Sequence, residues 1–333
     1  MIKIKSNLLR KTMRICITNK YKTWDNAKTG KGLFVKRLIP ALERLGCQVT
    51  TDPKKDVDIT LGIGKFVFSP KGKAVLRLGD AHKEKDHKKL NKPKKNSIEI
   101  ADGIIYQSGY SMKLCRIFIG EPKCTETVIF NGANPKAFNV EPYDSPYKHN
   151  FLASARVWTP QKRLLGIKRV FLESDVRDSC LFICGEVKTV VDAVYDPYNK
   201  MEIRFLGMVD QKTLASLYKT CCAMLDATWL TACPNNVVEA LVAGCPVISQ
   251  NASSVCELGL SERHDKAFYL IQDREWDMKK PVDFNKRRSV SRSAFIQAIK
   301  DVTSTPKTEF TYKSLHIDNI AKQYLGFFEK VLR

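Results

Sequence analysis

The sequence predicts an α/β protein made of two halves, each built around a parallel β-sheet. Short apolar runs of strand length alternate with amphipathic segments along the chain, as in parallel sheets that helices cover on both faces. Residues 141–150 carry two prolines and no apolar periodicity, which is typical of a linker. Because ligands of such sheets bind outside the carboxyl ends of the strands, we expect a site in a cleft between the halves.

The individual elements follow from the spacing of apolar residues. Two helices are indicated by apolar residues three or four positions apart, namely Phe34, Leu38, Leu42 and Leu45, and Ile320, Tyr324, Phe328 and Val331. Nine apolar runs have the length of strands and cover residues 15–18, 57–61, 75–78, 103–106, 151–154, 181–184, 203–206, 223–227 and 247–249. Residues 1–12 precede the first strand and are interpreted as an extension.

Length and composition exclude several classes of protein. The chain has 333 residues, enough for about two domains, and 44% of them are apolar, which excludes general disorder. No apolar run reaches the roughly 18 residues of a membrane-spanning helix, and the first residues lack the apolar core of a signal peptide. The eleven cysteines include no Cys-x-x-Cys pair, so neither a disulfide framework nor a zinc site is expected. We therefore expect a reducing compartment, the cytoplasm.

Positive charge is in large excess. Lysine and arginine number 56 against 35 aspartates and glutamates, a net charge of +21, which predicts attraction to the phosphates of nucleotides, nucleic acids or lipid headgroups. Residues 82–95 alone contain seven lysines and little apolar surface. We interpret this stretch as a solvated loop, and the alternative is a patch for an anionic membrane or a polyanionic acceptor. Peripheral contact with a membrane surface therefore stays open.

Two phosphate-binding motifs fail on inspection. Residues 25–32 match a P-loop only at their Gly-Lys pair, because the first glycine and the final Ser or Thr of that motif are both missing. Gly62 and Gly64 end a strand, but Val67 stands where a dinucleotide fingerprint has its third glycine. Neither motif identifies a nucleotide site by itself.

Four other features combine into one candidate site. The first is the pair Gly30 and Gly32, which lies between the opening strand and an amphipathic helix. Glycines there let the backbone approach a phosphate, and a helix amino terminus favours negative charge, although an ordinary turn is the alternative. The second is the pair Arg156 and Lys162, which follows a strand and precedes a helix. Both cations can converge on a diphosphate, unless they belong to a solvated basic turn.

The third feature is the run of residues 233–248. Pro234, Asn235 and Asn236 suit the start of a short helix, which a Gly-x-Pro sequence ends. Glu239 lies inside this otherwise apolar helix, where a carboxylate needs a partner. The two hydroxyls of a ribose would be a suitable partner, and an exposed helix face is the alternative.

The fourth feature is a pair of strand ends in the first half, within residues 101–108 and 128–134. Asn131 and Asn134 follow the second of these strands, near the expected cleft. Asparagine also favours turns, so a turn or a hinge is the alternative to a binding role.

The order and spacing of these features resemble those of retaining glycosyltransferases of family 4, which have the GT-B fold of two Rossmann-like, doubly wound domains facing an interdomain cleft. The resemblance runs from about Met13 to the end and is strongest over residues 101–138 and 151–258. It implies three parts: a domain on the acceptor side (residues 1–147), a nucleotide-sugar domain (residues 148–313) and a last helix that crosses back to the first domain (residues 314–333).

The resemblance also implies roles for individual residues. The glycine-rich loop of the family matches Gly30 and Gly32. The arginine and lysine that hold the donor diphosphate match Arg156 and Lys162, which would be the catalytic cations. The second glutamate of a Glu–seven residues–Glu motif, which holds the donor ribose, matches Glu239.

The sequence departs from the family at two places. Thr231 replaces the first glutamate of that motif, which contacts the donor sugar, so recognition of the sugar differs or transfer is slow. Thr231, Asn235 and Asn236 are still expected at the donor site. One branch of the family has an Arg-Leu-Asp-Gly segment. Residues 77–80 of this chain read Arg-Leu-Gly-Asp instead, so the last two residues are exchanged and the segment ends at Asp80. Asp80 or His82 is therefore a candidate to face the transferred sugar.

The expected activity is of the hexosyltransferase type. A sugar would move from a nucleoside-diphosphate sugar to an acceptor hydroxyl, with retention of the anomeric configuration. Fixed cations would stabilise the leaving diphosphate, so no metal and no cofactor are expected. The acceptor is open among glycan, lipid and protein, and nucleic acid is disfavoured because no recognition module for it is found. A sugar-nucleotide epimerase, a basic nucleic-acid-binding protein and an inactive sugar-binding relative are the alternatives.

Overall fold

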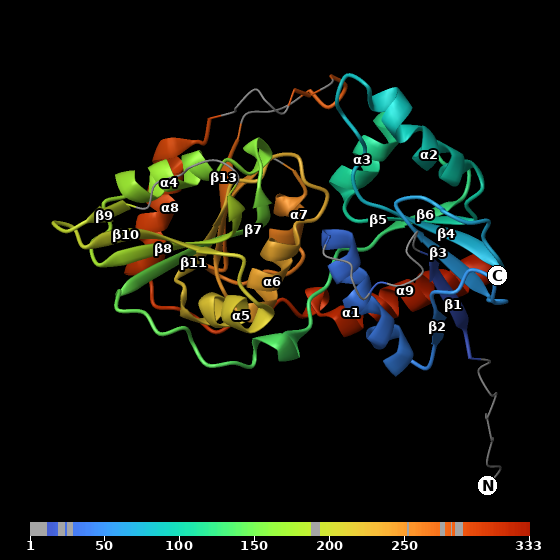
Figure 1. Ribbon diagram of the computed structural model, residues 1–333, viewed down its shortest axis with the longest axis horizontal. Helices are drawn as coiled ribbons and strands as arrows, with labels where there is room; N and C mark the ends of the chain where they lie inside the picture. Colours follow the sequence, from blue (N-terminus) through green and yellow to red (C-terminus); the bar gives the residue numbers. More distant parts are fainter. Residues whose placement is uncertain are drawn as a thin grey trace, which may run out of the picture.

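The computed structural model describes residues 12–18, 24, 29–187, 194–251, 253–273, 277–280, 282–283 and 289–333. These residues form two β-sheets, each with helices packed against it, in two domains that lie side by side (Figure 1). The predicted α/β class is confirmed. No described helix combines the length and the apolar character needed to cross a membrane.

The first domain contains a six-stranded sheet. Its strands are β1 (Arg14–Thr18), β2 (Gln48–Thr50), β3 (Ile59–Ile63), β4 (Lys73–Leu78), β5 (Gly103–Tyr106) and β6 (Thr125–Val128). They are parallel and pair in the order β2-β1-β3-β4-β5-β6. The connecting helices are α1 (Gly30–Arg44), α2 (His87–Glu99) and α3 (Gly109–Phe118). The strand order reverses beside β1, because β2 lies on one side of it and β3 on the other.

The second domain contains a seven-stranded sheet. Its strands are β7 (His149–Trp158), β8 (Ser179–Val187), β9 (Val194–Asp196), β10 (Met201–Gly207), β11 (Ala223–Asp226), β12 (Val247–Asn251) and β13 (Phe268–Gln272). They pair in the order β13-β12-β11-β7-β8-β10-β9, and only β9 runs antiparallel to its described neighbour. Here the order reverses beside β7, between β8 and β11.

Helices cover both faces of the second sheet. They are α4 (Leu164–Glu173), α5 (Gln211–Thr220), α6 (Asn235–Ala243), α7 (Val255–Gly259) and α8 (Arg292–Ser304). Short 3-10 helices are η1 (Pro135–Phe138), η2 (Pro160–Lys162) and η3 (Lys313–Leu315). Apolar residues of α5 and α6 form one core with the sheet, and those of α4 and α8 form a second core on the opposite face.

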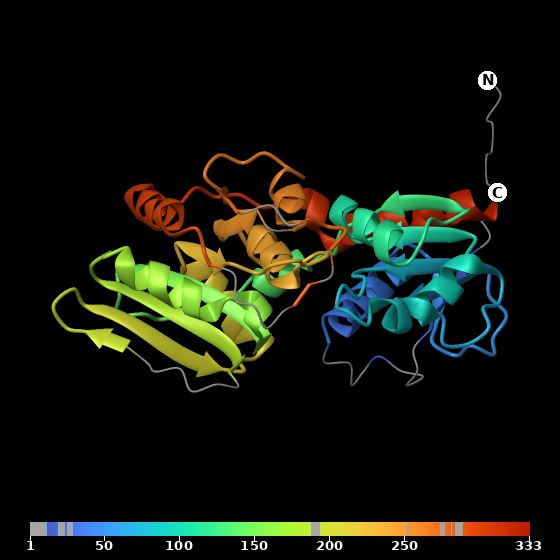
Figure 2. The same ribbon diagram turned by 90° about the horizontal axis from the view of Figure 1, so that it is seen from above.

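The last helix of the chain, α9 (Ile317–Leu332), completes the core of the first domain. Phe34 of α1 packs in the same cluster as Ile320, Tyr324 and Phe328 of α9. Full burial of such a side chain is worth roughly 1.5–3 kcal/mol. Figure 2 shows α9 lying along the first domain although it follows the whole second domain in sequence. The apolar faces predicted for the first and last helices are confirmed.

All nine predicted strands are present, with ends displaced by a few residues. Four strands lie outside the nine predicted runs, β2, β6, β9 and β13, and for β6 the sequence indicated only a strand end near residue 128. Each of the four lies at the edge of its sheet, where partly exposed residues give no continuous apolar run. The loop predicted for residues 82–95 is wrong from residue 87 onward, because α2 begins there. Lysine is a good helix former, and Asn91 and Ile98 anchor this helix by burial.

The domain interface is formed by segments that follow the carboxyl ends of strands. The side-chain Nδ2 of Asn235 donates to the backbone oxygen of Gly30 over 3.1 Å. Ser108 Oγ donates to the backbone oxygen of Ala232 over 2.6 Å. Both sheets therefore turn their carboxyl ends toward this interface, as a site between the halves requires.

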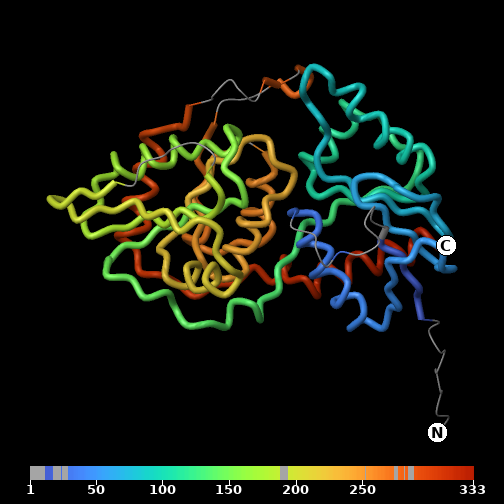
Figure 3. Tube along the Cα trace, in the orientation of Figure 1, coloured from blue at the N-terminus to red at the C-terminus, as the bar shows by residue number. Residues whose placement is uncertain are grey.

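The chain also connects the domains away from this interface. In the Cα trace, the described residues around 277–283 lie against the first domain, far from the sheet that precedes them in sequence (Figure 3). Val282 N donates to the backbone oxygen of Lys83 over 2.7 Å, and Met278 packs on the apolar cluster that contains Leu76 and Tyr106. This segment therefore helps to hold the domains together.

Candidate active site at the domain interface

The second sheet brings two chain segments together at the point where its strand order reverses. We call them the second edge: residues 154–163, from the last part of β7 onward, and residues 226–236, from the last residue of β11 onward. Gln161 joins the two segments, because its Nε2 donates to the backbone oxygens of Trp229 (2.6 Å) and Leu230 (2.9 Å). The Trp229 N–H donates back to the Gln161 oxygen over 3.0 Å.

Lys162 lies on the second edge beside a buried carboxylate. Burial lowers the pKa of its ammonium group, and the nearby Asp226 opposes that shift. Asp226 accepts hydrogen bonds from Thr228 Oγ1 (2.6 Å) and Ser249 Oγ (3.0 Å). Among the described residues, Lys162 Nζ makes no hydrogen bond or ion pair of its own, so it can bind an anion without breaking an existing bond. Sequence reasoning missed Asp226, although an aspartate ending an apolar strand could have indicated it.

The backbone of the second edge is strained next to two of the predicted residues. Arg163 follows Lys162 and Leu230 precedes Thr231, and both have left-handed backbones, with φ of 52° and 57°. Such conformations cost of order 1–3 kcal/mol each and cluster at functional sites. The Arg163 guanidinium is buried and stabilises this geometry through an ion pair with Asp273 (3.0 Å).

Arg156 lies on the same edge and is exposed. The register between β7 and β8 shifts between Ser154 and Val157, and this bulge places Arg156 outside the regular ladder. A Cβ atom at Gly185 on β8 would come within 1.6 Å of the Ala155 oxygen, so the bulge requires glycine opposite it. Arg156 and Lys162 lie on the same segment of the second edge, and their binding of a shared anion stays a prediction.

Three of the four candidate asparagines hold segments together, and the fourth, Asn134, caps η1 by accepting from Lys136 N over 3.1 Å. Asn236 Nδ2 donates to the backbone oxygen of Ser154 over 2.9 Å, which joins α6 to the end of the regular part of β7. Asn131 Nδ2 donates to Asn235 Oδ1 over 2.7 Å, while Asn235 in turn reaches Gly30 in the first domain. A binding role for these asparagines stays a prediction, and their observed contacts position the start of α6.

Glu239 is buried in α6, with only 5% of its surface exposed. The alternative of an exposed helix face is therefore wrong. Its Oε1 accepts an ion-paired hydrogen bond from Arg37 of α1, across the domain interface. Sequence reasoning correctly required a partner for this carboxylate but missed Arg37, because nothing in the sequence links positions so far apart.

The remaining donor-side predictions lie around the interface. Gly30 begins α1, and Gly32 N donates to Thr29 Oγ1 over 3.2 Å, which caps the helix. Thr231 is half-buried, and its backbone oxygen accepts a hydrogen bond from Ser254 Oγ over 3.0 Å. Among the described residues the Thr231 hydroxyl makes no hydrogen bond, and its role at the donor site stays a prediction.

Asp80 and His82 follow β4 in the first domain and do not lie on the second edge. Both Asp80 carboxylate oxygens accept from Lys83 Nζ at 2.7 Å. The His82 side chain is partly exposed, and burial together with Lys94 lowers the pKa of its imidazole. In the part of the chain that the structure describes, no group of three or more His, Cys, Asp or Glu is arranged to hold a metal ion.

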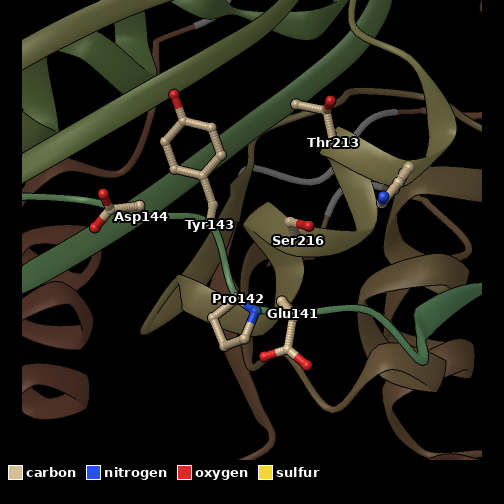
Figure 4. A pocket seen from close by; sticks show the side chains of 7 residues that line it. Glu141, Pro142, Tyr143, Asp144, Thr213 and Ser216 are labelled. Atoms are coloured by element: carbon tan, nitrogen blue, oxygen red, sulfur yellow. The ribbon is translucent and has the colours of Figure 1, made fainter.

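A surface hollow lies apart from these residues, between the linker and α5 (Figure 4). Its walls are Glu141, Pro142, Tyr143, Asp144, Lys212, Thr213 and Ser216. No predicted site residue contributes to it. The linker is fixed there because Thr220 Oγ1 donates to the Tyr143 oxygen over 2.9 Å.

No family model matches the chain, and a search of curated proteins finds no significant match. Solved structures do resemble it. Sucrose-phosphate synthase from Thermosynechococcus elongatus aligns with a TM-score of 0.61 at 12% identity, over 96% of this chain and 99% of that one. HepE from Anabaena in complex with UDP-glucose aligns with a TM-score of 0.58 at 12% identity, over 96% and 100%. The lipopolysaccharide outer core galactosyltransferase WaaB gives 0.59 at 14% identity, over 96% and 100%.

The chain has the GT-B fold. The predicted architecture of two Rossmann-like domains is thereby confirmed. Identities this low establish the fold alone, so membership of family 4 stays a prediction.

Proposed function

We propose that this protein is a glycosyltransferase that moves a sugar from a nucleoside-diphosphate sugar to an acceptor hydroxyl. The observation that carries the proposal is the second edge, where Lys162 lies near Asp226 but, among the described residues, makes no hydrogen bond or ion pair through its Nζ. The segment that contains Asp226 continues to the start of α6. The similar structures support it, because WaaB is a galactosyltransferase by name and HepE holds UDP-glucose. Ligands of open α/β sheets bind at such reversal points.

We assign Lys162 and Arg156 to the donor diphosphate. A hydrogen bond to a charged group contributes about 1.5–3 kcal/mol, and Lys162 can make one without losing another. Asn235 and Asn236 begin α6, whose amino-terminal N–H groups add positive potential at the same place. The Glu239 carboxylate would accept hydrogen bonds from the ribose hydroxyls while it also accepts the hydrogen bond from Arg37.

The reaction needs only charges that the chain already holds. The bond between the anomeric carbon and the diphosphate oxygen breaks, and negative charge grows on the diphosphate. Lys162 and Arg156 stabilise that charge without reorganising, so we propose a reaction that is independent of metal. The acceptor oxygen bonds to the anomeric carbon on the face that the diphosphate leaves, and its proton passes to a departing phosphate oxygen. This front-face route retains the anomeric configuration and requires no carboxylate nucleophile.

Thr231 stands in the second edge where the related motif has an acidic residue. A hydroxyl can donate and accept hydrogen bonds to a sugar, but it cannot place a negative charge beside it. We therefore propose that the donor sugar is held more weakly here than in enzymes with the acidic residue.

The test is binding of nucleotide sugars to Lys162→Gln, Arg156→Gln and the matched control Lys212→Gln, which changes an exposed lysine of the hollow shown in Figure 4. We expect a panel of nucleotide sugars to yield at least one ligand by calorimetry, with a dissociation constant raised at least tenfold in Lys162→Gln and unchanged in Lys212→Gln. Circular dichroism verifies that each variant is folded. Unchanged affinity in a folded Lys162→Gln would overturn the assignment.

A further inference from the structure

The first sheet has its own reversal point, beside β1, and the side chains there carry excess positive charge. We call this region the first edge, residues 29–32, 62–65 and 78–83 together with Lys94. Lys31 lies in the first turn of α1, and its Nζ lies 3.1 Å from the place where a Cβ atom at Gly64 would stand. Gly64 directly follows β3, and β3 pairs with β1, so Lys31 lies near the carboxyl ends of these two strands.

Lys94 reaches the same place from α2. Its Nζ donates to the backbone oxygen of Asp80 over 2.6 Å, which is a neutral partner. The Asp80 carboxylate is already occupied, because both of its oxygens accept from the buried Lys83 at 2.7 Å. Within the described ranges, neither Lys31 Nζ nor Lys94 Nζ forms an ion pair, although the Asp80 carboxylate is close enough to attract both ammonium groups. The cations here therefore outnumber the one carboxylate that they share with Lys83.

A third cation, Arg77, pairs only with neutral groups in the part of the chain that the structure describes. Arg77 is 1% exposed, and its guanidinium donates to Asn131 Oδ1 and to Tyr324 OH (2.7 Å for the latter). Its remaining face stacks on the Phe34 ring, with 4.0 Å from the guanidinium carbon to the ring centroid. Burying a charge without an opposite charge is expensive, so this arrangement raises the positive potential of the first edge.

The electrostatic consequence is visible in both lysines. Burial and the neighbouring Lys31 lower the pKa of Lys94 to about 8. Burial and the positive charge of Arg77 lower the pKa of Lys31. Like charges that are held together disfavour their own protonated forms, and an anion placed between them would reverse that effect. A fold that keeps such repulsion at the reversal point of a sheet is typical of a binding site.

We propose that the first edge binds an anionic group, a phosphate or a carboxylate, carried by the acceptor of the sugar. The inference rests on the proposed function, because it assigns the first domain to the acceptor. An anion there would bond Lys31 and Lys94 and lie at the amino terminus of α1, whose first turn contains no acidic residue. The acceptor hydroxyl would then be presented toward the second edge by a fixed charge contact.

The outward lysines of α2 do not explain this feature. Lys88 and Lys92 are exposed on that helix, and neither has a partner among the described residues. They contribute to the general positive potential, as any exposed cations do. Lys94 differs, because its side chain points inward and bonds Asp80. If the anion site is specific, replacing Lys31 and Lys94 should weaken anion binding more than replacing Lys88 and Lys92. If the attraction is diffuse, both replacements should weaken it equally.

The experiment titrates inorganic phosphate into the full chain by calorimetry at constant ionic strength. Four proteins are compared: the parent, the double variant Lys31→Gln/Lys94→Gln, the double control Lys88→Gln/Lys92→Gln with the same change of charge, and Lys162→Gln. We expect the dissociation constant for phosphate to rise at least tenfold in the first double variant. In the control and in Lys162→Gln, a phosphate site with the parent affinity should remain. Acetate is titrated in parallel, and the tighter of the two anions indicates which group the acceptor carries.

Three outcomes would overturn the proposal. The first is that neither anion binds the parent. The second is an equal loss in both double variants, which would assign binding to diffuse charge. The third is a loss only in Lys162→Gln, which would leave the donor edge as the anion site. Thermal melts verify folding, and Lys31→Gln alone, at an exposed position, keeps the test valid if the double variant is unstable.

The two proposals fail separately. If nucleotide sugars bind through Lys162 but no anion binds at Lys31 and Lys94, only the acceptor assignment is wrong. If phosphate binds at the first edge but no nucleotide sugar binds, the anion site stands and the transferase assignment is wrong.

Discussion

Each carboxyl edge of this molecule lies where the strand order of its sheet reverses, but the cations of the two edges have different partners. On the second edge, Arg163 has Asp273 as a buried partner, and Lys162 has Asp226 nearby. On the first edge, Lys31 and Lys94 share surroundings in which the one nearby carboxylate is already bonded to Lys83. We infer that internal ion pairs stabilise the second edge. On the first edge the cations repel one another, and binding of an external anion would reduce that repulsion. Removing a cation should therefore have opposite effects on stability at the two edges.

The largest effect is expected for Arg163→Met on the second edge. This change leaves Asp273 as a buried carboxylate without its cation, which costs about 3–5 kcal/mol. Urea denaturation should show that loss in the free energy of unfolding. The control Arg169→Met removes an exposed arginine of α4 and should stay within about 0.5 kcal/mol. Equal free energies of unfolding for Arg163→Met and Arg169→Met would contradict the claim that internal ion pairs stabilise the second edge.

A smaller loss is expected at the interface between the edges, for Glu257→Gln. The Glu257 carboxylate accepts from the backbone N–H groups of Gly109 (2.6 Å) and Tyr110 (2.7 Å), at the start of α3. Loss of a charged acceptor at a helix amino terminus costs about 0.5–2 kcal/mol. The measurement is again urea denaturation, with Glu121→Gln at an exposed position as the control. No difference between these variants would mean that the cross-domain contact carries no stability.

The first edge should respond to pH in a way that depends on Lys94. Its folded-state pKa of about 8 lies below the ordinary value of 10.5, so below pH 8 the folded protein bears the full penalty of a protonated Lys94. As pH rises from about 8 to 10.5, the folded state releases this proton while the unfolded state keeps it, and the parent gains stability. The stability advantage of Lys94→Gln over the parent should therefore be largest near pH 7 and shrink above pH 8.

That difference is measured by urea denaturation of both proteins at each pH, which cancels the contributions of the buried cysteines and tyrosines. An advantage independent of pH would show that Lys94 is not repelled in the folded state. Saturating phosphate should remove the advantage, because the bound anion would compensate the charge.

The smallest effect is expected for Lys31→Gln. Lys31 is exposed as a residue, but its ammonium group is partly buried and repelled by Arg77. Removing this group should therefore raise stability by no more than about 0.5 kcal/mol in buffer without phosphate. A thermal melt measures the shift, with Lys88→Gln as the control for a general change of charge. A clear fall in melting temperature would mean that Lys31 has an internal partner and would break the comparison.

The sequence predicted the fold through properties that are local along the chain. Apolar runs and helical spacing place the strands and both terminal helices, because each depends on neighbouring residues alone. The error at α2 has a physical reason, since its lysines give no apolar face and its anchor is Asn91, whose Nδ2 donates to the backbone oxygen of His82 over 2.9 Å. Side chains that bond backbone in this way leave no periodic signal.

The site was predictable only in part, because its contacts join distant positions. Arg156, Lys162 and Glu239 could be singled out from strand ends and from an unpartnered carboxylate. Arg37 and Lys94 could not, since their roles depend on how α1 and α2 meet Glu239 and Asp80 after folding. The charge balance of an edge is a property of the tertiary structure, and the total of +21 does not indicate where it is concentrated.

The position of α9 has a consequence for biosynthesis. Ile320, Tyr324 and Phe328 fill the core between α1 and the first sheet, yet they leave the ribosome after the entire second domain. Domains usually mature in the order in which they are translated. Here the first domain keeps the apolar surface that α9 covers exposed until α9 has been synthesised. We therefore expect chaperones to bind nascent chains that stop before α9.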